Sequence, residues 1–243
     1  MDGVDGLGIA LIEAALLLAA TVQGASGLGF NLTSAPLVNA IMPGPASVGL
    51  INLFALLQNA WLVIRERGRI RWRVFRIMGP ALAVGVGIGF AMVRLIPDAA
   101  MPILVAVSAL GSLVTLIAWR ATPGPAEGAI AGVWSGAINT YAGVGGPPVA
   151  SYLISQGWPH GDFLRTMQVV FIGIDIVSLP ILGLPALPWW FYAIGVGCLL
   201  AGTAIGSLLR HRLTQRKAVL LSRTVIAIAA VVSLVYSTAS LMG

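Results

Sequence analysis

The chain has 243 residues, of which 58% are hydrophobic and only 9% carry a charge, and its mean hydropathy is +0.95. Soluble domains carry about 25% charged residues, so this chain has too little polar surface to coat a water-soluble particle. A membrane span needs about 20 apolar residues, so apolar segments occupy nearly the whole chain and leave no room for a soluble catalytic domain.

The net charge of +6 does not indicate a nucleic-acid partner, because ten of the fourteen basic residues lie in two short segments, 65–76 and 210–217. Each segment lies between apolar runs, and such loops face the cytoplasm under the positive-inside rule. We therefore expect a multi-pass protein of the cell's inner or plasma membrane, with the lipid bilayer as a partner and both basic segments cytoplasmic. The single cysteine, Cys198, supports neither a disulfide nor a metal site, and we expect no cofactor.

The first apolar segment, 7–41, is interrupted by the glycine-rich stretch QGASGLGFN at 23–31. Prolines 43 and 45 then mark a turn. Three uninterrupted apolar runs follow at about 47–64, 77–93 and 99–119, with the first basic segment between the first two. A linker rich in proline and glycine ends this half of the chain.

The same order recurs in the second half, where NTYAGVGGPP at 139–148 interrupts segment 128–155 and three apolar runs follow. At a shift of 116 residues, Gly27 falls on Gly143 and Gly29 on Gly145. The shift also pairs polar residues: Gln23 with Asn139, Asn52 with Gln168, and Asn59 with Asp175. We therefore predict a first membrane repeat at 1–121, a linker at 122–127 and a second repeat at 128–243, which together form one integrated membrane domain.

The charge distribution bears on the topology. Eight full crossings would place the two basic segments on opposite faces, because five segments separate them. If 7–41 and 128–155 are instead re-entrant hairpins, each half crosses three times, the halves are inverted, and both basic segments are cytoplasmic. We predict an all-α membrane protein of two inverted repeats, each with a glycine-broken first segment followed by three transmembrane helices. The alternative is eight plain crossings.

The two glycine-rich breaks are the predicted substrate-binding site. Non-helical backbone at membrane depth is tolerated only inside protein or beside water, and a helix that starts after a break directs its positive dipole end at the gap, which suits an anion. The structural alternative is close helix packing, which we prefer for Gly85, Gly87, Gly89, Gly202 and Gly206. The candidate binding residues are Gln23, Ser26, Gly27, Gly29, Asn31, Thr33, Asn52, Asn139, Tyr141, Gly143, Gly145, Gly146, Pro147 and Gln168.

Charged residues inside the spans are expensive and usually functional. Asp175 lies mid-span and is the candidate proton carrier; the alternative is a structural contact with Arg223 or a buried amide. Arg165 and Arg223 are candidate anion contacts, and the alternative for Arg223 is that it snorkels to the cytoplasmic face. Glu13, in the first apolar run, is assigned neither role.

The breaks resemble known motifs. GASGLG at 24–29 with Pro36, and GVGGPP at 143–148, are similar to the paired glycine-rich motifs of the sulfite exporter TauE/SafE family. Through the repeat, the resemblance covers nearly the whole chain. It implies transport of sulfite, sulfonates or related small anions, coupled to protons.

No phosphate-binding loop, metal-ligand cluster or nucleophile elbow occurs in the sequence. An ATP-driven pump would therefore have no ATP-binding site within this chain. We predict a secondary transporter, not an enzyme, in which a small anionic substrate binds between the breaks and the halves alternate access. A passive anion channel, a membrane-embedded enzyme and an accessory subunit are the alternatives. The direction of transport and a homo-oligomeric state are left open.

Overall fold

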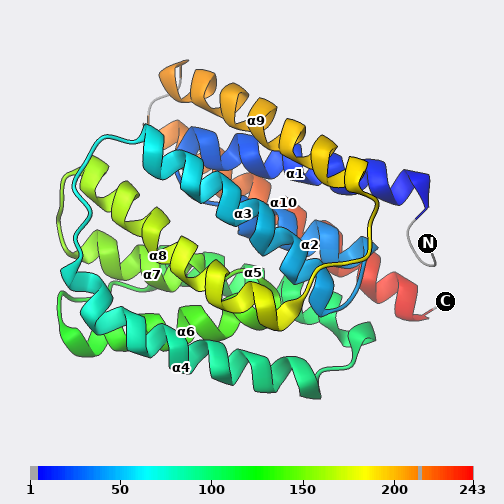
Figure 1. The fold of residues 1–243 in the computed structure, drawn as a ribbon, viewed down its shortest axis with the longest axis horizontal. Coiled ribbons are helices and arrows are strands. Elements are labelled where there is room, and N and C mark those ends of the chain that lie inside the picture. The colour runs from blue at the N-terminus through cyan, green and yellow to red at the C-terminus, as the bar shows by residue number, and fades with distance from the viewer. Residues whose placement is uncertain (1–4, 213–214, 243) are drawn as a thin grey trace.

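The computed structural model describes the backbone of residues 5–212 and 215–242, and within these ranges it is helical without strands. Most helices run roughly along the long axis of the molecule (Figure 1). The elements are α1 (Gly6–Ser26), α2 (Phe30–Ile41), α3 (Pro45–Arg65), α4 (Arg73–Leu95), the short 3-10 helix η1 (Asp98–Ala100), α5 (Met101–Ala118), α6 (Pro125–Ala142), α7 (Gly146–Ser155), α8 (His160–Leu182), α9 (Trp189–Arg212) and α10 (Gln215–Met242). Helix α6 thus begins within the stretch 122–127 that we interpret as the linker.

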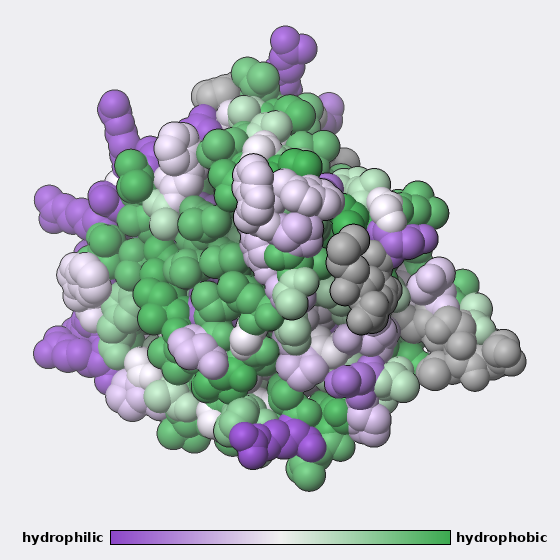
Figure 2. Space-filling view, turned by 45° about the vertical axis from the view of Figure 1, so that its right-hand side comes forward, coloured by the Kyte–Doolittle hydropathy of each residue, from purple (hydrophilic) through white to green (hydrophobic). Residues whose placement is uncertain are grey.

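Among the described residues, six helical segments are long and apolar enough to cross a membrane: α1, α3, α4, η1 with α5, α8 and α9. The described part of α10 adds a shorter apolar stretch, Arg223–Tyr236. Figure 2 shows hydrophobic side chains over most of the visible face and hydrophilic ones projecting at its margin. The prediction of a multi-pass membrane protein is confirmed. Helix α1, with 21 residues, is longer than the apolar run alone indicated and reaches spanning length.

Both predicted breaks are present, and each divides the first segment of its half into two helices. Gly27 ends α1 with φ 82°, and Gly143 ends α6 with φ 74°. This left-handed conformation favours glycine. In each break the glycine N–H donates to a carbonyl in the last turn, to Gln23 O at 2.7 Å and to Asn139 O at 2.9 Å. The prediction of two helix breaks 116 residues apart is confirmed.

In each half, the shorter helix after the break folds back along the longer one. The start of α1, at Asp5 and Gly8, lines one groove together with the end of α2, at Leu37 and Ile41. In the second half, a Cβ added to Gly128 near the start of α6 would lie 2.8 Å from Tyr152 Cζ near the end of α7. Each pair therefore returns to the end of the molecule at which it began, as Figure 1 shows for α1 and α2.

The described parts of both basic segments lie at one end of the molecule, on the left in Figure 1. Arg210 Nη1 and Glu66 Oε1 form an ion pair at 2.5 Å, which joins the end of α9 to the end of α3. Arg71 pairs with Asp162 at the start of α8. Residues 213 and 214 of the second basic segment lie outside the described residues. Helix α1 begins, and α10 ends, at the opposite end.

Two long helix pairs, α1 with α9 and α4 with α6, flank the central pair α3 and α8. Glycines allow the close approach within the flanking pairs, because an added Cβ would overlap a backbone oxygen of the facing helix at Gly85, Gly89, Gly202 and Gly206. The packing interpretation is confirmed for these four residues. It is wrong for Gly87, which is exposed with open space beside it.

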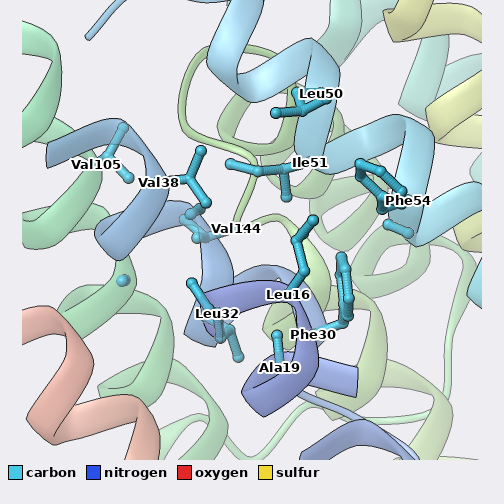
Figure 3. Packing of buried hydrophobic residues seen from close by; sticks show 14 of the residues in the cluster. Leu16, Ala19, Phe30, Leu32, Val38, Leu50, Ile51, Phe54, Val105 and Val144 are labelled. Carbon is cyan, nitrogen blue, oxygen red and sulfur yellow. The ribbon is translucent and has the colours of Figure 1, made fainter. Parts of the chain in front are cut away.

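The largest cluster of buried hydrophobic residues lies where α1, α2 and α3 meet. Leu16, Phe30, Ile51 and Phe54 converge there (Figure 3), and each is at most 1% exposed. Since Phe30 is the first residue of α2, this core holds the helix start that follows the first break.

Candidate functional site

The two breaks border one small cavity inside the helix bundle. Its volume is about 30 Å³, enough for roughly two water molecules. Helices α1, α2, α3, α6, α7 and α8 and the first break all contribute to its wall, which consists of Gln23, Leu28, Gly29, Phe30, Asn31, Leu32, Asn59, Asn139, Gly146, Phe171, Ile174 and Asp175.

The polar side of this cavity is built from matching residues of the two halves. Gln23 Nε2 donates to Asn59 Oδ1 at 2.8 Å, and Asn139 Nδ2 donates to Asp175 Oδ1 at 3.4 Å. The second bond is the first one shifted by 116 residues along the chain. Asn59 Nδ2 also donates to Asp175 Oδ2 at 3.3 Å, which links the two halves directly. The aligned polar pairs therefore converge in space.

The start of α2 is fixed by the same amides. Phe30 N, at the first position of the helix, donates to Gln23 Oε1 at 2.9 Å. Asn31 Nδ2 faces two oxygens, Asn52 Oδ1 at 3.4 Å and Asn139 Oδ1 at 3.5 Å. The positive end of the α2 dipole thus points at the cavity, because the first three residues of the helix line it.

Backbone groups released by the breaks find side-chain partners. Gln168 Nε2 of α8 donates to Gly27 O at 3.0 Å, and the hydroxyl of Ser135 on α6 donates to the carbonyl of Gly145. Such bonds replace the helical bonds that the breaks remove, which membrane-depth backbone requires. Helix α7 offers fewer donors than α2, because Pro147 follows Gly146 and is itself followed by a second proline, and proline has no N–H.

Asp175 is the one ionisable side chain among the cavity-lining residues within the described part of the chain. It is 2% exposed and accepts hydrogen bonds from the amides of Asn59 and Asn139. No ion pair with Arg223 occurs among the described residues, so of the structural alternatives the contact with buried amides is the one present. An anion beside the ionised carboxylate would be repelled, whereas the protonated acid can donate a hydrogen bond to it.

Comparison with known proteins identifies the family. A family profile described as "Sulfite exporter TauE/SafE" matches residues 12–236. The chain belongs to the sulfite exporter TauE/SafE family. The predicted resemblance is confirmed, and the matched range includes both breaks and every residue that lines the cavity. TauE/SafE is a family of transporters. No curated protein and no solved structure matches the chain significantly.

Within this TauE/SafE protein, the predicted binding residues fall into three groups. The first lines the cavity: Gln23, Gly29, Asn31, Asn139 and Gly146, with the predicted proton carrier Asp175. The second lies directly behind the lining or shapes the breaks: Gly27, Asn52, Gly143, Gly145, Pro147 and Gln168.

The third group lies away from the TauE/SafE cavity. Ser26 Oγ lies within hydrogen-bond distance of Val22 O in α1 and of Leu28 O in the first break. Tyr141 bonds to Ser108 at 2.9 Å, and the hydroxyl of the buried Thr33 has no partner among the described residues. Arg165 Nη1 donates to the carbonyl of residue 68 at the basic end. The remaining candidate, Arg223, lines a different cavity.

Six lining residues were not among the predicted candidates. Asn59 is polar, and its alignment with Asp175 at the shift of 116 residues is a sequence signal that identifies it as a site residue. The other five are apolar and carry no sequence signal that separates them from ordinary core residues: Leu28, Phe30, Leu32, Phe171 and Ile174.

Proposed function

We propose that this protein is a proton-coupled secondary transporter of a small sulfur oxyanion or organosulfonate. The observation that carries the proposal is the cavity at which both helix breaks meet, where amide groups from both halves surround a single buried carboxyl group. Membership of a family described as sulfite exporters supports the choice of substrate class.

The amides and the α2 helix start suit a small anion. Hydrogen bonds to charged groups contribute about 1.5–3 kcal/mol each, so several are needed to replace the anion's water shell. Gln23, Asn31 and Asn139 can supply side-chain N–H donors by exchanging their present partners for the substrate. Because the cavity of about 30 Å³ holds only about two waters, its walls must separate when the substrate binds.

The carboxyl group of Asp175 makes coupling to protons the natural mechanism. An anion can share the cavity with Asp175 only when the carboxyl group is protonated. Two negative charges inside one small, buried cavity would repel each other strongly. Substrate and proton therefore bind together and leave together.

The folding-back of α2 and α7 supports two inverted repeats. The hairpin of α1 and α2 opens at one end of the molecule, and that of α6 and α7 opens at the other. In a membrane, this arrangement supports a re-entrant first segment in each repeat, and together with the positive-inside rule it supports a cytoplasmic position for both basic segments, 65–76 and 210–217. A binding site between broken helices of inverted repeats is a common transporter plan.

Transport by purified protein in liposomes tests the proposal. Uptake of labelled sulfite, sulfate, thiosulfate and ethanesulfonate is measured with and without an inward proton gradient. We expect a sulfur oxyanion or sulfonate to accumulate above its external concentration only when the gradient is present. Equilibration without accumulation would instead establish a passive channel, and no flux of any of the four anions would overturn the substrate class.

A further inference from the structure

A second, larger cavity lies beside the central one. We call it the vestibule: a space of about 390 Å³ between α5, α7, α8 and α10, next to the first break. Leu28 lines both the vestibule and the central cavity, so its side chain lies in the wall between them. Leu116 and Trp158 belong to the apolar part of the vestibule's wall.

The vestibule also borders the basic end of the molecule. His160, at the start of α8, lines both the vestibule and a third space of about 530 Å³ between the ends of α1, α3 and α9. That third space is lined by Arg65, Arg67 and Arg210, with Glu66 as its acidic residue. Three neighbouring spaces, each sharing a lining residue with the next, thus lie between the basic end and the central cavity.

Arg223 gives the vestibule a positive charge. No acidic side chain occurs among the vestibule's described lining residues, and Arg223 Nε is buried without a hydrogen-bond partner among the described residues. A cation in apolar surroundings is costly unless an opposite charge pairs with it. The cavity therefore favours an anion beside Arg223.

Leu28 lies where the two breaks meet. It lies between Gly27 at φ 82° and Gly29 at φ 122°, two backbone conformations that favour glycine. Ser26 Oγ bonds to the Leu28 carbonyl at 2.6 Å and lies 3.3 Å from the Leu28 N–H. A Cβ added to Gly146 would lie 3.5 Å from Leu28 Cδ1, so the Leu28 side chain extends from the first break to the second.

We propose that the vestibule is the path by which the anion travels between the basic end and the central cavity, with Arg223 as its transient contact and Leu28 as the side chain that closes the cavity. This inference rests on the proposed transport function and adds the route and its gate.

Thiol labelling tests the charge of the vestibule without using any transported substrate. In a Cys198→Ser background, Leu116→Cys places one thiol in the vestibule. The thiol is then treated, from the side of the basic segments, with an anionic or a cationic methanethiosulfonate reagent of similar size, each rate being normalised to that with a free thiol. We expect the anionic reagent to react at least about fivefold faster, from the attraction of one nearby charge. Arg223→Gln should clearly lower this preference, leaving only the contribution of the arginines at the basic end, and Arg223→Lys should retain it.

The gate is tested with a thiol in the central cavity, introduced as Ile174→Cys. We expect slow labelling when Leu28 is present and faster labelling in the Leu28→Ala variant. Leu37→Ala, in the groove at the opposite end, is the matched control and should leave the rate unchanged.

An absent charge preference, a preference that Arg223→Gln does not lower, or an unchanged rate at Ile174→Cys in the Leu28→Ala variant would overturn the inference. If labelling follows these expectations but the protein transports none of the four sulfur anions, the proposed path and gate stand and only the substrate assignment is refuted.

Discussion

At the scale of single residues, the site depends on amides more than on charges. Gln23, Asn59 and Asn139 form a buried network that ends at the carboxyl group of Asp175. Amide N–H groups can donate hydrogen bonds to an anion without adding a positive charge to the cavity. The one carboxyl group then makes the negative charge of the cavity dependent on a proton.

Replacing Asp175 tests its role as the proton carrier. Asp175→Asn retains the shape and leaves the cavity neutral at every pH. In the wild type we expect uptake to rise as the external pH falls, because protonation removes the repulsion between carboxylate and substrate. The variant should transport at a rate independent of pH and should no longer accumulate substrate. Substrate flux of wild type and variant is measured between pH 5 and pH 8. A variant whose pH profile is unchanged from wild type would exclude Asp175 from proton coupling.

Residue patterns anticipated part of this site and missed part of it. The 116-residue shift alone pairs Gln23 with Asn139, because polar side chains are rare enough in apolar helices to stand out. The position of Tyr141 beside the break predicts a place in the site, yet its hydroxyl bonds to Ser108. Which face of a helix meets a cavity depends on packing with distant helices, and one sequence does not contain that information in readable form.

At the scale of elements, the breaks combine glycines with different tasks. Gly145 packs against α6, since an added Cβ would overlap the Ser135 carbonyl oxygen. Gly146 lines the cavity, and its Cβ would make only ordinary contacts, at 3.5 Å from Leu28 and from Phe171. Gly145→Leu should therefore abolish uptake by distorting the break, whereas a change at Gly146 probes the cavity itself.

The variant Gly146→Ala adds one methyl group to a cavity with little free space. We expect the half-saturating substrate concentration to rise about tenfold, which corresponds to about 1.4 kcal/mol and lies within the usual cost of overfilling a packed site. The matched control is Gly173→Ala in α8, at an exposed position with open space. Equal transport by both variants would argue against substrate binding at the second break.

The flanking helix pairs depend on their glycines for close contact. Gly206→Leu should push α9 away from α1, because even a Cβ at this position would overlap the Thr21 carbonyl oxygen. We expect the free energy of unfolding to fall by about 1–3 kcal/mol, measured as a lower melting temperature in detergent. Gly197→Leu, in the same helix with open space beside it, is the control. A similar melting temperature for the two variants would contradict the packing role.

At the scale of the whole molecule, composition and charge predicted the class of protein more securely than its arrangement. The membrane location follows from the absence of enough polar residues, a property that no packing detail can alter. The division of each first segment followed from glycines and prolines, whose backbone preferences act locally. The length of α1 could not be predicted from the apolar run, because the helix continues through the polar residue Gln23 and the small residues after it to Ser26.

Cross-linking across the two halves tests the arrangement. With Cys198 removed and a protease site inserted at 119–124, Glu66→Cys and Arg210→Cys should be joined by a short bifunctional thiol reagent, since their native side chains form an ion pair. The two fragments then stay together on a denaturing gel after cleavage. Asp98→Cys with Arg210→Cys is the control and should not cross-link, because Asp98 lies beside Gly44 at the other end. Eight plain crossings would place residues 66 and 210 on opposite faces and prevent the first cross-link.

The contact between Asn59 and Asp175 joins two positions that correspond at the shift of 116 residues, and the two side chains meet at 3.3 Å. If such halves arose by duplication of one segment, both positions began with the same residue. Two aspartates would repel or share a proton, and two asparagines would carry none. A single substitution at this meeting point is therefore enough to turn a symmetric, uncharged pair into one that holds a single exchangeable proton.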